Sequence, residues 1–278
     1  MAELIAIDDP ADPRIAAYRD IRERDLVGRD GLFVAEGKVV LEKLVDSRQA
    51  GPQSLLIADK RVAALTPLLD RLPDDLPVYT AGQAVLDAVA GFPLHRGILA
   101  IGRRIDPPSP DQALADAAAR GRDVLLLSAI ANHDNMGGIF RNAAGFGVGA
   151  VLLDRDCCDP LYRKAIRVSV GATLLVPFAR LAAGDDPLAL LDAHGFSPLA
   201  LSPQGAERLA DLRPEGRQAV LLGAEGPGLS PALLACTRSV RIDMADGFDS
   251  LNVATTSGIV LHHLATRFAS VATGNRAR

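Results

Sequence analysis

The segment VLLGAEGPGLS, residues 220–230, holds the clearest indication of the fold. Its first residues form a continuous apolar run of strand length, and the Gly- and Pro-rich residues that follow break that strand with a loop. Similar apolar runs, each followed by Gly, Asn, Asp or Pro and then by a helical pattern, lie at residues 124–130, 150–153, 198–202 and 239–243. Continuous apolar strands that alternate with helices predict an α/β fold with a parallel sheet covered on both faces.

The N-terminal half shows the same alternation on a smaller scale, which predicts a small α/β domain. A Pro-rich stretch at residues 106–110 carries no apolar periodicity and is expected to belong to a linker. The predicted organisation is a domain at 1–106, a linker at 107–122 and a second domain at 123–278. Within the first domain we expect helices at 36–47, after Val62 and near 83–90, and strands at 54–59, 77–80 and 97–102.

Length and composition fit two domains with substantial hydrophobic cores. The chain has 278 residues, and 49% of them are hydrophobic, which excludes general disorder. No apolar run reaches the roughly 18 residues needed to cross a bilayer, so we expect a cytoplasmic protein without membrane contact. Three Cys residues without a CxxC pair predict a reducing compartment and no metal site. The formal net charge of −4 argues against a protein covered with basic residues, but it allows a local basic patch.

Three loops after predicted strands carry the candidate functional residues, because ligands of parallel sheets bind at the carboxyl ends of the strands. These loops cover residues 132–147 (NHDNMGGIFRNAAGFG), 223–230 (GAEGPGLS) and 242–254 (IDMADGFDSLNVA). The glycines at 145, 147 and 149 end a predicted helix instead of opening one, and GAEGPG lacks the GK[ST] ending of a phosphate-binding loop. An oxidoreductase with a dinucleotide site is therefore disfavoured, because its glycine loop and acidic ribose ligand are both missing.

Taken together and in this order, the three loops resemble the motifs of the SpoU (TrmH-like) RNA ribose 2′-O-methyltransferases of the SPOUT class. The first motif resembles the pair Asn135 and Arg141, the second LLGAEGPGLS, and the third residues 242–253 with their Ser-Leu-Asn-Val core. The segment DPLYRKAIRVSVGA, residues 159–172, also resembles a family segment, so the likeness spans about 124–268. One departure is Asp243, which stands where the family usually has Pro, and this change predicts a less rigid loop.

The resemblance implies a C-terminal SPOUT domain closed by a trefoil knot around a parallel sheet. It also implies that the first half is an RNA substrate-binding domain, an α/β fold that resembles kink-turn-binding ribosomal proteins. S-adenosylmethionine is the implied cofactor, and the implied substrate is the ribose 2′-OH of structured rRNA or tRNA. The implied assembly is a homodimer through the knot domain, with each active site completed by both subunits. The alternative is a catalytically inactive, RNA-binding relative of the same fold.

The resemblance also assigns roles to individual residues. Arg141 is expected to hold the target phosphate and to stabilise the alkoxide charge that develops on the ribose oxygen. The alternative role for Arg141 is that of the base that removes the 2′-OH proton. An Arg side chain is hard to deprotonate, which favours the first role. Glu225 is expected near Arg141 of the same or the partner subunit, where it orients the guanidinium. Asn135, Ser250 and Asn252 are either helix caps or part of the reaction centre, with Asn252 able to bind the ribose. The implied cofactor contacts are Gly223, Ile242, Met244 and Leu251, and the expected RNA-binding residues are Arg155, Arg163, Lys164 and Arg167.

Overall fold

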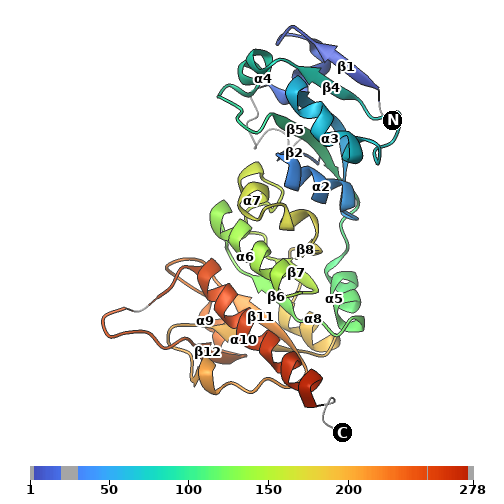
Figure 1. Ribbon diagram of the computed structural model, residues 1–278. Helices are drawn as coiled ribbons and strands as arrows, with labels where there is room; N and C mark the ends of the chain where they lie inside the picture. The colour runs from blue at the N-terminus through green and yellow to red at the C-terminus, as the bar shows by residue number, and fades with distance from the viewer. Residues whose placement is uncertain (1–2, 20–30, 249, 275–278) are drawn as a thin grey trace. The chain divides into compact units, whose positions relative to one another are not determined.

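The computed structural model describes residues 3–19, 31–248 and 250–274, which form two compact units (Figure 1). The N-terminal unit consists of Met1–Asp106 and Pro160–Leu175, and the C-terminal unit consists of Pro107–Asp159 and Val176–Arg278. Each unit has its own sheet and its own hydrophobic core. Across the described residues, no helix combines the length and the apolar character that a membrane crossing requires.

The C-terminal unit is built on a seven-stranded parallel sheet with the strand order β10-β12-β9-β11-β6-β7-β8, which confirms the predicted parallel α/β fold. Strands β6 and β7 are buried at every residue, as their continuous apolar sequences require. The strands are β6 (Val124–Leu127), β7 (Ala150–Leu153), β8 (Phe178–Arg180), β9 (Phe196–Leu201), β10 (Glu207–Arg208), β11 (Arg217–Leu222) and β12 (Arg238–Arg241). The helices are α5 (Pro110–Ala119), α6 (His133–Gly145), α8 (Pro187–Ala193), α9 (Pro231–Ala235) and α10 (Val253–Gly274), with the 3₁₀ helix η4 (Leu209–Asp211).

The N-terminal unit contains a mixed five-stranded sheet with the order β1-β4-β3-β5-β2. Strands β1 and β3 are parallel to β4, whereas β5 is antiparallel to β3 and to β2. The strands are β1 (Leu4–Ile7), β2 (Leu32–Glu36), β3 (Ala50–Ala58), β4 (Val78–Ala81) and β5 (Ile98–Arg104). The helices are α2 (Lys38–Asp46), α3 (Val62–Leu69), α4 (Gln83–Ala90) and α7 (Arg163–Val168), with the 3₁₀ helices η1 (Pro13–Tyr18), η2 (Asp59–Arg61) and η3 (Ala172–Leu174).

The predicted linker at 107–122 is wrong, because this segment contains helix α5. Ser109 caps the helix by accepting a hydrogen bond from the backbone N–H of Gln112, and Pro110 occupies the first turn. Ala113, Leu114 and Ala117 are buried in the core of the C-terminal unit. The Pro-rich stretch therefore leads into a packed helix.

The predicted second domain is also not contiguous, because residues 160–175 pack in the N-terminal unit. This segment lies between β7 and β8 in the sequence. The Nζ of Lys43 donates a hydrogen bond to the carbonyl oxygen of Val170 at 2.6 Å, and the hydroxyl of Ser47 donates one to the carbonyl oxygen of Leu174 at 2.5 Å. Helix α7 also contacts β2. The chain therefore leaves the C-terminal unit after Asp159 and returns to it at Val176.

Candidate active site

A cavity of about 450 Å³ lies at the carboxyl ends of β9, β11 and β12 in the C-terminal unit. Its volume is in the range typical of small-molecule sites. The loops that follow these three strands form its walls, as expected for a parallel sheet. All four residues predicted as cofactor contacts line the cavity: Gly223, Ile242, Met244 and Leu251. Three of the predicted catalytic residues line it as well: Glu225, Ser250 and Asn252.

The loop after β11 can take its shape only because it is rich in glycine. An added Cβ at Gly223 would lie 2.3 Å from the carbonyl carbon of Gly228 and 2.4 Å from the nitrogen of Leu229, both of which are backbone atoms. The loop closes on itself through a hydrogen bond from the N–H of Gly228 to the carbonyl oxygen of Ala224 at 3.0 Å. Gly226 and Gly228 have φ angles of 88° and 68°, a region that favours glycine. The wall of the cavity here is therefore mostly backbone.

A polar cluster at the cavity joins the three sequence motifs. The Oε1 atom of Glu225 accepts a hydrogen bond from Asn135 Nδ2 at 2.8 Å and one from Asn252 Nδ2 at 3.1 Å. Asn252 Nδ2 also donates to Asn135 Oδ1 at 2.8 Å. Asn135 is only 5% exposed, so its amide depends on these partners. Hydrogen bonds to a carboxylate are stronger than those between neutral groups, and they hold Glu225 in a fixed orientation.

The two asparagines differ in their relation to the helix ends. Asn132, not Asn135, caps α6, because Asn132 Oδ1 accepts from the backbone N–H of Asp134 at 2.7 Å. Asn135 lies inside that helix, so its side chain is free to bind Glu225. Asn252 does cap α10, since its Oδ1 accepts from the N–H groups of Ala254 and Thr255 at 2.9 and 3.2 Å.

The expectation that Asn252 binds the substrate ribose does not agree with this geometry. An amide side chain has two donor hydrogens, and those of Asn252 are used by Asn135 and Glu225. Its oxygen already accepts two backbone hydrogen bonds. Asn252 is therefore a positioning residue that fixes Glu225 and the start of α10.

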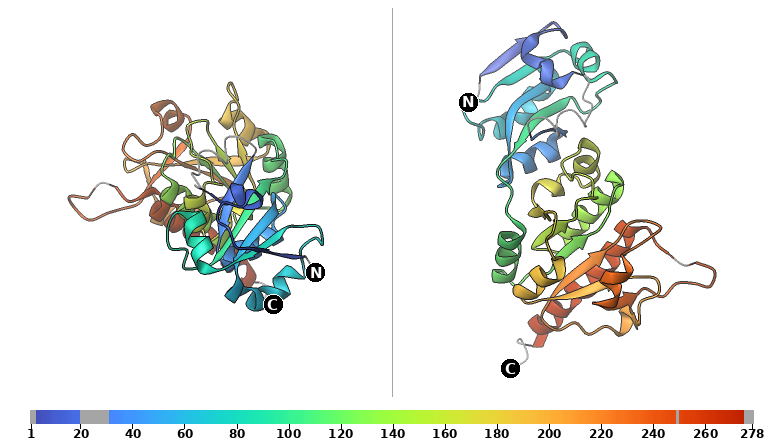
Figure 2. Two further views of the ribbon diagram at one scale, coloured as in Figure 1. Left: turned by 90° about the horizontal axis from the view of Figure 1, so that it is seen from above. Right: turned by 180° about the vertical axis from the view of Figure 1, so that it is seen from behind.

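Close packing of α6 against α10 brings the first and third motifs together (Figures 1 and 2). An added Cβ at Gly138 would lie 2.7 Å from the Cβ of Ala254, so glycine lets the two helices approach. Asn142 Nδ2 donates to the carbonyl oxygen of Ala254 at 2.7 Å and to the hydroxyl of Ser257 at 2.9 Å. Asn142 was not identified from the sequence, although it stands next to Arg141 in an otherwise apolar segment.

Arg141 does not join the polar cluster within one chain. It is exposed on α6 and makes no hydrogen bond or ion pair with the described part of the chain. Six residues correspond to about 1.7 helical turns, so the side chains of Arg141 and Asn135 leave α6 on different sides. Contact between Arg141 and Glu225 therefore remains a prediction for the partner subunit.

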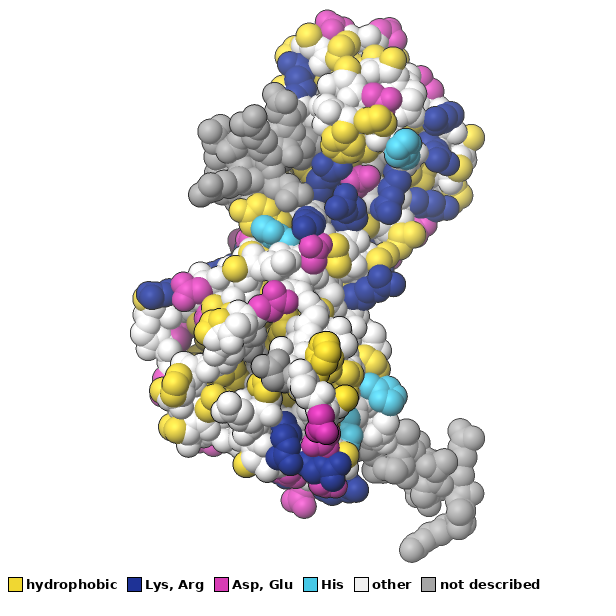
Figure 3. Space-filling view, turned by 90° about the vertical axis from the view of Figure 1, so that its left-hand side faces the viewer, with side chains coloured by type: hydrophobic (Ala, Val, Ile, Leu, Met, Phe, Trp, Pro, Cys, Tyr) yellow, Lys and Arg dark blue, Asp and Glu magenta, His cyan; other side chains and the backbone are white. Residues whose placement is uncertain are grey.

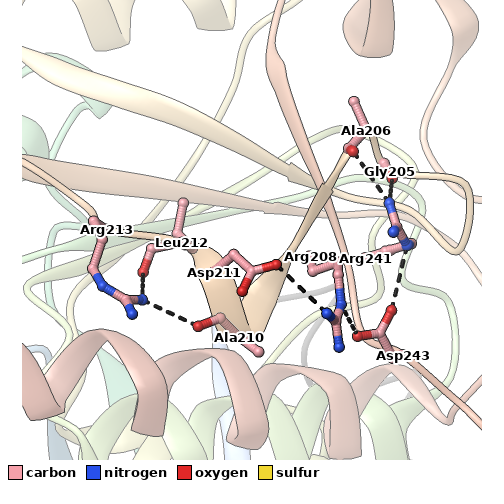
Figure 4. A network of polar contacts seen from close by, with 9 residues as sticks. All are labelled: Gly205, Ala206, Arg208, Ala210, Asp211, Leu212, Arg213, Arg241 and Asp243. Carbon is pink, nitrogen blue, oxygen red and sulfur yellow. Dashed lines mark hydrogen bonds and ion pairs between the residues drawn. The ribbon is translucent and has the colours of Figure 1, made fainter.

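Asp243, which replaces the family's usual Pro, is held by two arginines (Figure 4). Arg208 Nε donates to Asp243 Oδ2 at 2.5 Å, and Arg241 Nε lies 3.4 Å from Oδ1. Arg241 Nη1 also donates to the carbonyl oxygens of Gly205 and Ala206 at 2.8 and 3.1 Å. The expected loss of rigidity is therefore offset by an ionic tether between β10 and the loop after β12.

The four predicted RNA-binding residues are divided between the two units. Arg155 belongs to the C-terminal unit and its side chain is 81% exposed, with Asp156 at 3.6 Å. Lys164 and Arg167 lie on α7 in the N-terminal unit, where Arg167 is exposed and Lys164 is half-buried. The RNA-binding role of Arg155, Lys164 and Arg167 remains a prediction.

The RNA-binding role predicted for Arg163 does not agree with its environment. Its Nη2 lies 2.7 Å from Glu36 Oε2, and the two side chains are only 12% and 10% exposed. The guanidinium also stacks over the ring of Phe92 at 4.7 Å from the centroid. Arg163 therefore fastens α7 to β2 instead of reaching a ligand.

Some of the cavity-lining residues were not identified as site residues from the sequence. Ser202 and Pro203 follow β9, and the rule that ligands bind after strand ends applies to them as well. Thr256 stands four residues after Asn252, which places it on the same side of α10. Among the described residues, no group of three or more His, Cys, Asp and Glu is arranged to hold a metal ion.

Comparisons with known proteins identify the family of the chain. The model of a family described as the SpoU rRNA Methylase family matches residues 123–262. A protein of Mycobacterium tuberculosis, named an uncharacterized tRNA/rRNA methyltransferase, is 42% identical and aligns over 91% of this chain and 89% of its own length. The 23S rRNA (guanosine-2′-O-)-methyltransferase RlmB of Acinetobacter baylyi is 29% identical over 73% of this chain and 83% of its own.

Two solved structures share the fold. An AdoMet-bound rRNA methyltransferase from Sinorhizobium meliloti superposes with a TM-score of 0.77 at 22% identity, covering 95% of this chain and 98% of that chain. The SpoU methyltransferase AviRb from Streptomyces viridochromogenes, in complex with AdoMet, gives a TM-score of 0.74 at 20% identity, covering 93% and 99%. The likeness therefore extends over both units of the chain.

Proposed function

Because this chain belongs to the SpoU rRNA Methylase family, we propose that it transfers a methyl group from S-adenosylmethionine to a ribose 2′-oxygen of rRNA or tRNA. The observation that carries the proposal is the polar cluster of Asn135, Glu225 and Asn252 at a cavity of cofactor size. The name of the RlmB relative, a guanosine-2′-O-methyltransferase, supports the ribose as the target.

The residues around the cavity fit S-adenosylmethionine. Leu222, Ile242 and Leu251 offer apolar contacts for an adenine ring, and the glycine loop from Gly223 offers backbone groups that no side chain covers. The carboxylate of Glu225 is a suitable neighbour for a cationic ligand. The cofactor supplies a methyl group on a positively charged sulfur, which makes the group open to attack by an oxygen.

The contribution of the protein is positioning and charge stabilisation. Glu225, held by two amides, is the group that would orient the guanidinium of Arg141 from the partner subunit. That guanidinium would hold the target phosphate and stabilise charge that develops on the 2′-oxygen. A guanidinium is a poor proton acceptor, so the proposed role of Arg141 is electrostatic. As the methyl group leaves sulfur for the 2′-oxygen, the proton of the 2′-OH passes to water. Ser250 lines the cavity on the side of the third motif and is a further candidate for substrate contact.

The proposed assembly is a homodimer through the C-terminal domain, which closes as a trefoil knot. The exposed position of Arg141 supports a role across subunits, because one chain leaves it without a contact to the cluster in the described residues. A knot requires close approach of backbone segments that are distant in the sequence. Such an approach exists at Gly205, where an added Cβ would lie 2.3 Å from the carbonyl carbon of Val240.

Transfer of a labelled methyl group to RNA tests the function. Purified protein, S-adenosyl-[methyl-³H]methionine and total RNA from cells that lack the gene should give label in RNA, and RNA from cells that contain the gene should accept little. The alternative, an inactive RNA-binding relative, predicts RNA binding without label in either RNA. The intact polar cluster favours the enzyme, since binding alone does not require Glu225 to be held between two amides.

Removing the tether at Asp243 should weaken cofactor binding by a small factor. The hydrogen bond from Arg208 holds the pKa of Asp243 below its ordinary range. A lowered carboxyl pKa means that the tether is present above that pKa and is lost only as the pH falls through it. We therefore expect Asp243→Asn to reduce the affinity for S-adenosylmethionine about two- to fivefold, as for an exposed ion pair.

Calorimetry at several pH values checks this prediction. The ratio of the affinities of wild type and Asp243→Asn should be the same at pH 6 and at pH 8, and it should shrink in high salt. A ratio that rises between these two pH values would show that Asp243 titrates there and that the ion pair does not hold it.

A further inference from the structure

The N-terminal unit contains a cavity of about 350 Å³ that the proposed methyl transfer does not use. It lies at the start of α2, and four basic residues line it: Lys38, Arg61, Arg96 and Arg167. No Asp or Glu is among the described residues that line it. Lys and Arg side chains gather on the face of the N-terminal unit that Figure 3 turns to the viewer.

Among the described residues, these cations have no strong partners. Arg61, Arg96 and Arg167 are exposed and form no ion pair with residues that the structure describes. Lys38 has only a distant partner in Glu42, at 3.8 Å, and both side chains are exposed. Like charges around one cavity repel each other, and a cavity lined by one sign of charge concentrates the opposite sign. The cavity is therefore suited to an anionic ligand.

The backbone adds to this positive field. Gly37 precedes α2 without a side-chain cap, so the first N–H groups of that helix have no capping side chain. Gly37 has a φ of 91°, and an added Cβ would lie 2.9 Å from Arg96 Cδ. The Arg96 side chain thus packs against the positive end of the helix dipole, an arrangement that an anion between them would stabilise.

The cavity is also lined by apolar residues. Val39 is 50% exposed, although it is apolar, and Val170 lines the cavity from the segment between β7 and β8. Val170 has a φ of 54°, which is rare and strained for a β-branched residue, and its carbonyl oxygen is held by Lys43 Nζ. A ligand that combines a flat apolar ring with a phosphate matches both kinds of lining residue, the apolar and the basic.

We propose that this cavity binds one unpaired nucleotide of the RNA substrate, with its base against Val39 and Val170 and its phosphates among Arg61, Arg96 and Arg167. Proteins read RNA mainly in single-stranded loops and bulges, whose bases are free to leave the stack. The cavity is large enough for one nucleotide, because small-molecule sites begin at about 300 Å³. This inference rests on RNA being the substrate, and it adds a second RNA-binding point in a different unit from the methyl-transfer site.

Binding of two matched RNA hairpins to the full-length protein tests the proposal. One hairpin carries a single-stranded bulge, and in the other the bulge is paired. We expect wild type to bind the bulged hairpin more tightly. The double variant Arg61→Ala, Arg96→Ala should bind it at least about tenfold more weakly, and the slope of log affinity against log salt should fall by about 0.7 for each phosphate that the variant no longer neutralises. Val39→Asp should also weaken binding, and should remove the preference for the bulge.

Arg48→Ala is the matched control, because Arg48 is exposed in the same unit and does not line the cavity. Melting temperature and affinity for S-adenosylmethionine should be unchanged in all these variants. The proposal would be overturned if the double variant lost no more RNA affinity than Arg48→Ala. It would also be overturned if the double variant lost affinity equally for both hairpins.

The outcome is distinguishable from failure of the proposed function. If wild type methylates RNA and the double variant does so with unchanged KM, the cavity is not a nucleotide site and the enzymatic function stands. If wild type binds the bulged hairpin through the cavity but methylates no RNA, the nucleotide site stands and the enzymatic function fails.

Discussion

Replacing Arg141 with Ala should reduce the rate of RNA methylation by about 10²–10³-fold, as for removal of an electrostatic stabiliser from a preorganised site. Affinity for S-adenosylmethionine should stay within a few-fold, because Arg141 does not line the cavity. The melting temperature should barely change, because the side chain is exposed and makes no polar contact in the described part of the chain. Arg141→Lys keeps the charge but loses the planar fork, so it should recover little activity. Rates, melting temperatures and cofactor affinities of both variants check this prediction.

Mixed dimers show which subunit supplies Arg141. Arg141→Ala and Glu225→Gln should each be inactive alone. If Arg141 acts in the partner's site, a dimer of one variant with the other contains one site with both side chains intact, and mixing restores activity. If Arg141 acts within its own chain, every site keeps one defect and mixing restores nothing. Normal activity in Arg141→Ala by itself would remove its catalytic assignment.

Replacing Gly223 with Ala should weaken S-adenosylmethionine binding by about tenfold to a hundredfold. The new Cβ would lie 2.3 Å from the Gly228 carbonyl carbon and 2.4 Å from the Leu229 nitrogen, so the backbone there leaves it no room. Overpacking of this kind costs about 1–3 kcal/mol, and each 1.4 kcal/mol corresponds to a tenfold change in affinity. The loop after β11 must shift, and with it the wall of the cavity and the carboxylate of Glu225.

Gly145→Ala is the matched control for this variant. Gly145 ends α6, has an ordinary φ, and an added Cβ would meet nothing within 4 Å. We expect its cofactor affinity and melting temperature to equal those of wild type. Equal cofactor affinity in Gly223→Ala would show that the loop after β11 does not shape the cofactor site. Calorimetry with S-adenosylmethionine measures both variants.

The sheet of the C-terminal unit was predictable from sequence because its strands are short apolar runs with clear ends. Val124–Leu127 and Ala150–Leu153 are buried along their whole length, so the hydrophobic pattern alone identifies them. Strands β8 and β10 were not predicted, since they have only three and two residues. The loops of the site were found by the same logic, because each follows a predicted strand.

Tertiary contacts between distant residues were not predictable from local patterns. Arg163 pairs with Glu36, which is 127 residues away in the sequence, and this ion pair helps to fasten residues 160–175 to the N-terminal unit. In the sequence alone, Arg163 is one of several basic residues and has the appearance of a phosphate-binding group. The same holds for Asn132 and Asn135, which both stand near the start of α6; only the structure shows which of them is the cap.

The position of residues 160–175 also changes how a truncation should be designed. Deleting the first 106 residues removes Glu36, Lys43 and Ser47, which bind this segment. Such a truncated chain would carry α7 without the sheet it packs on, and a fall in RNA methylation in it would not report on RNA binding alone. Point variants in the full-length protein are therefore the better test of the N-terminal unit.

The chemical form of the labelled RNA tests the central claim most directly. RNA methylated by the protein with S-adenosyl-[methyl-³H]methionine is hydrolysed in alkali, which cleaves the chain only next to a free 2′-OH. If the methyl group is on the ribose 2′-oxygen, the label appears in alkali-resistant dinucleotides. Label in mononucleotides would place the methyl group on a base and would contradict the account.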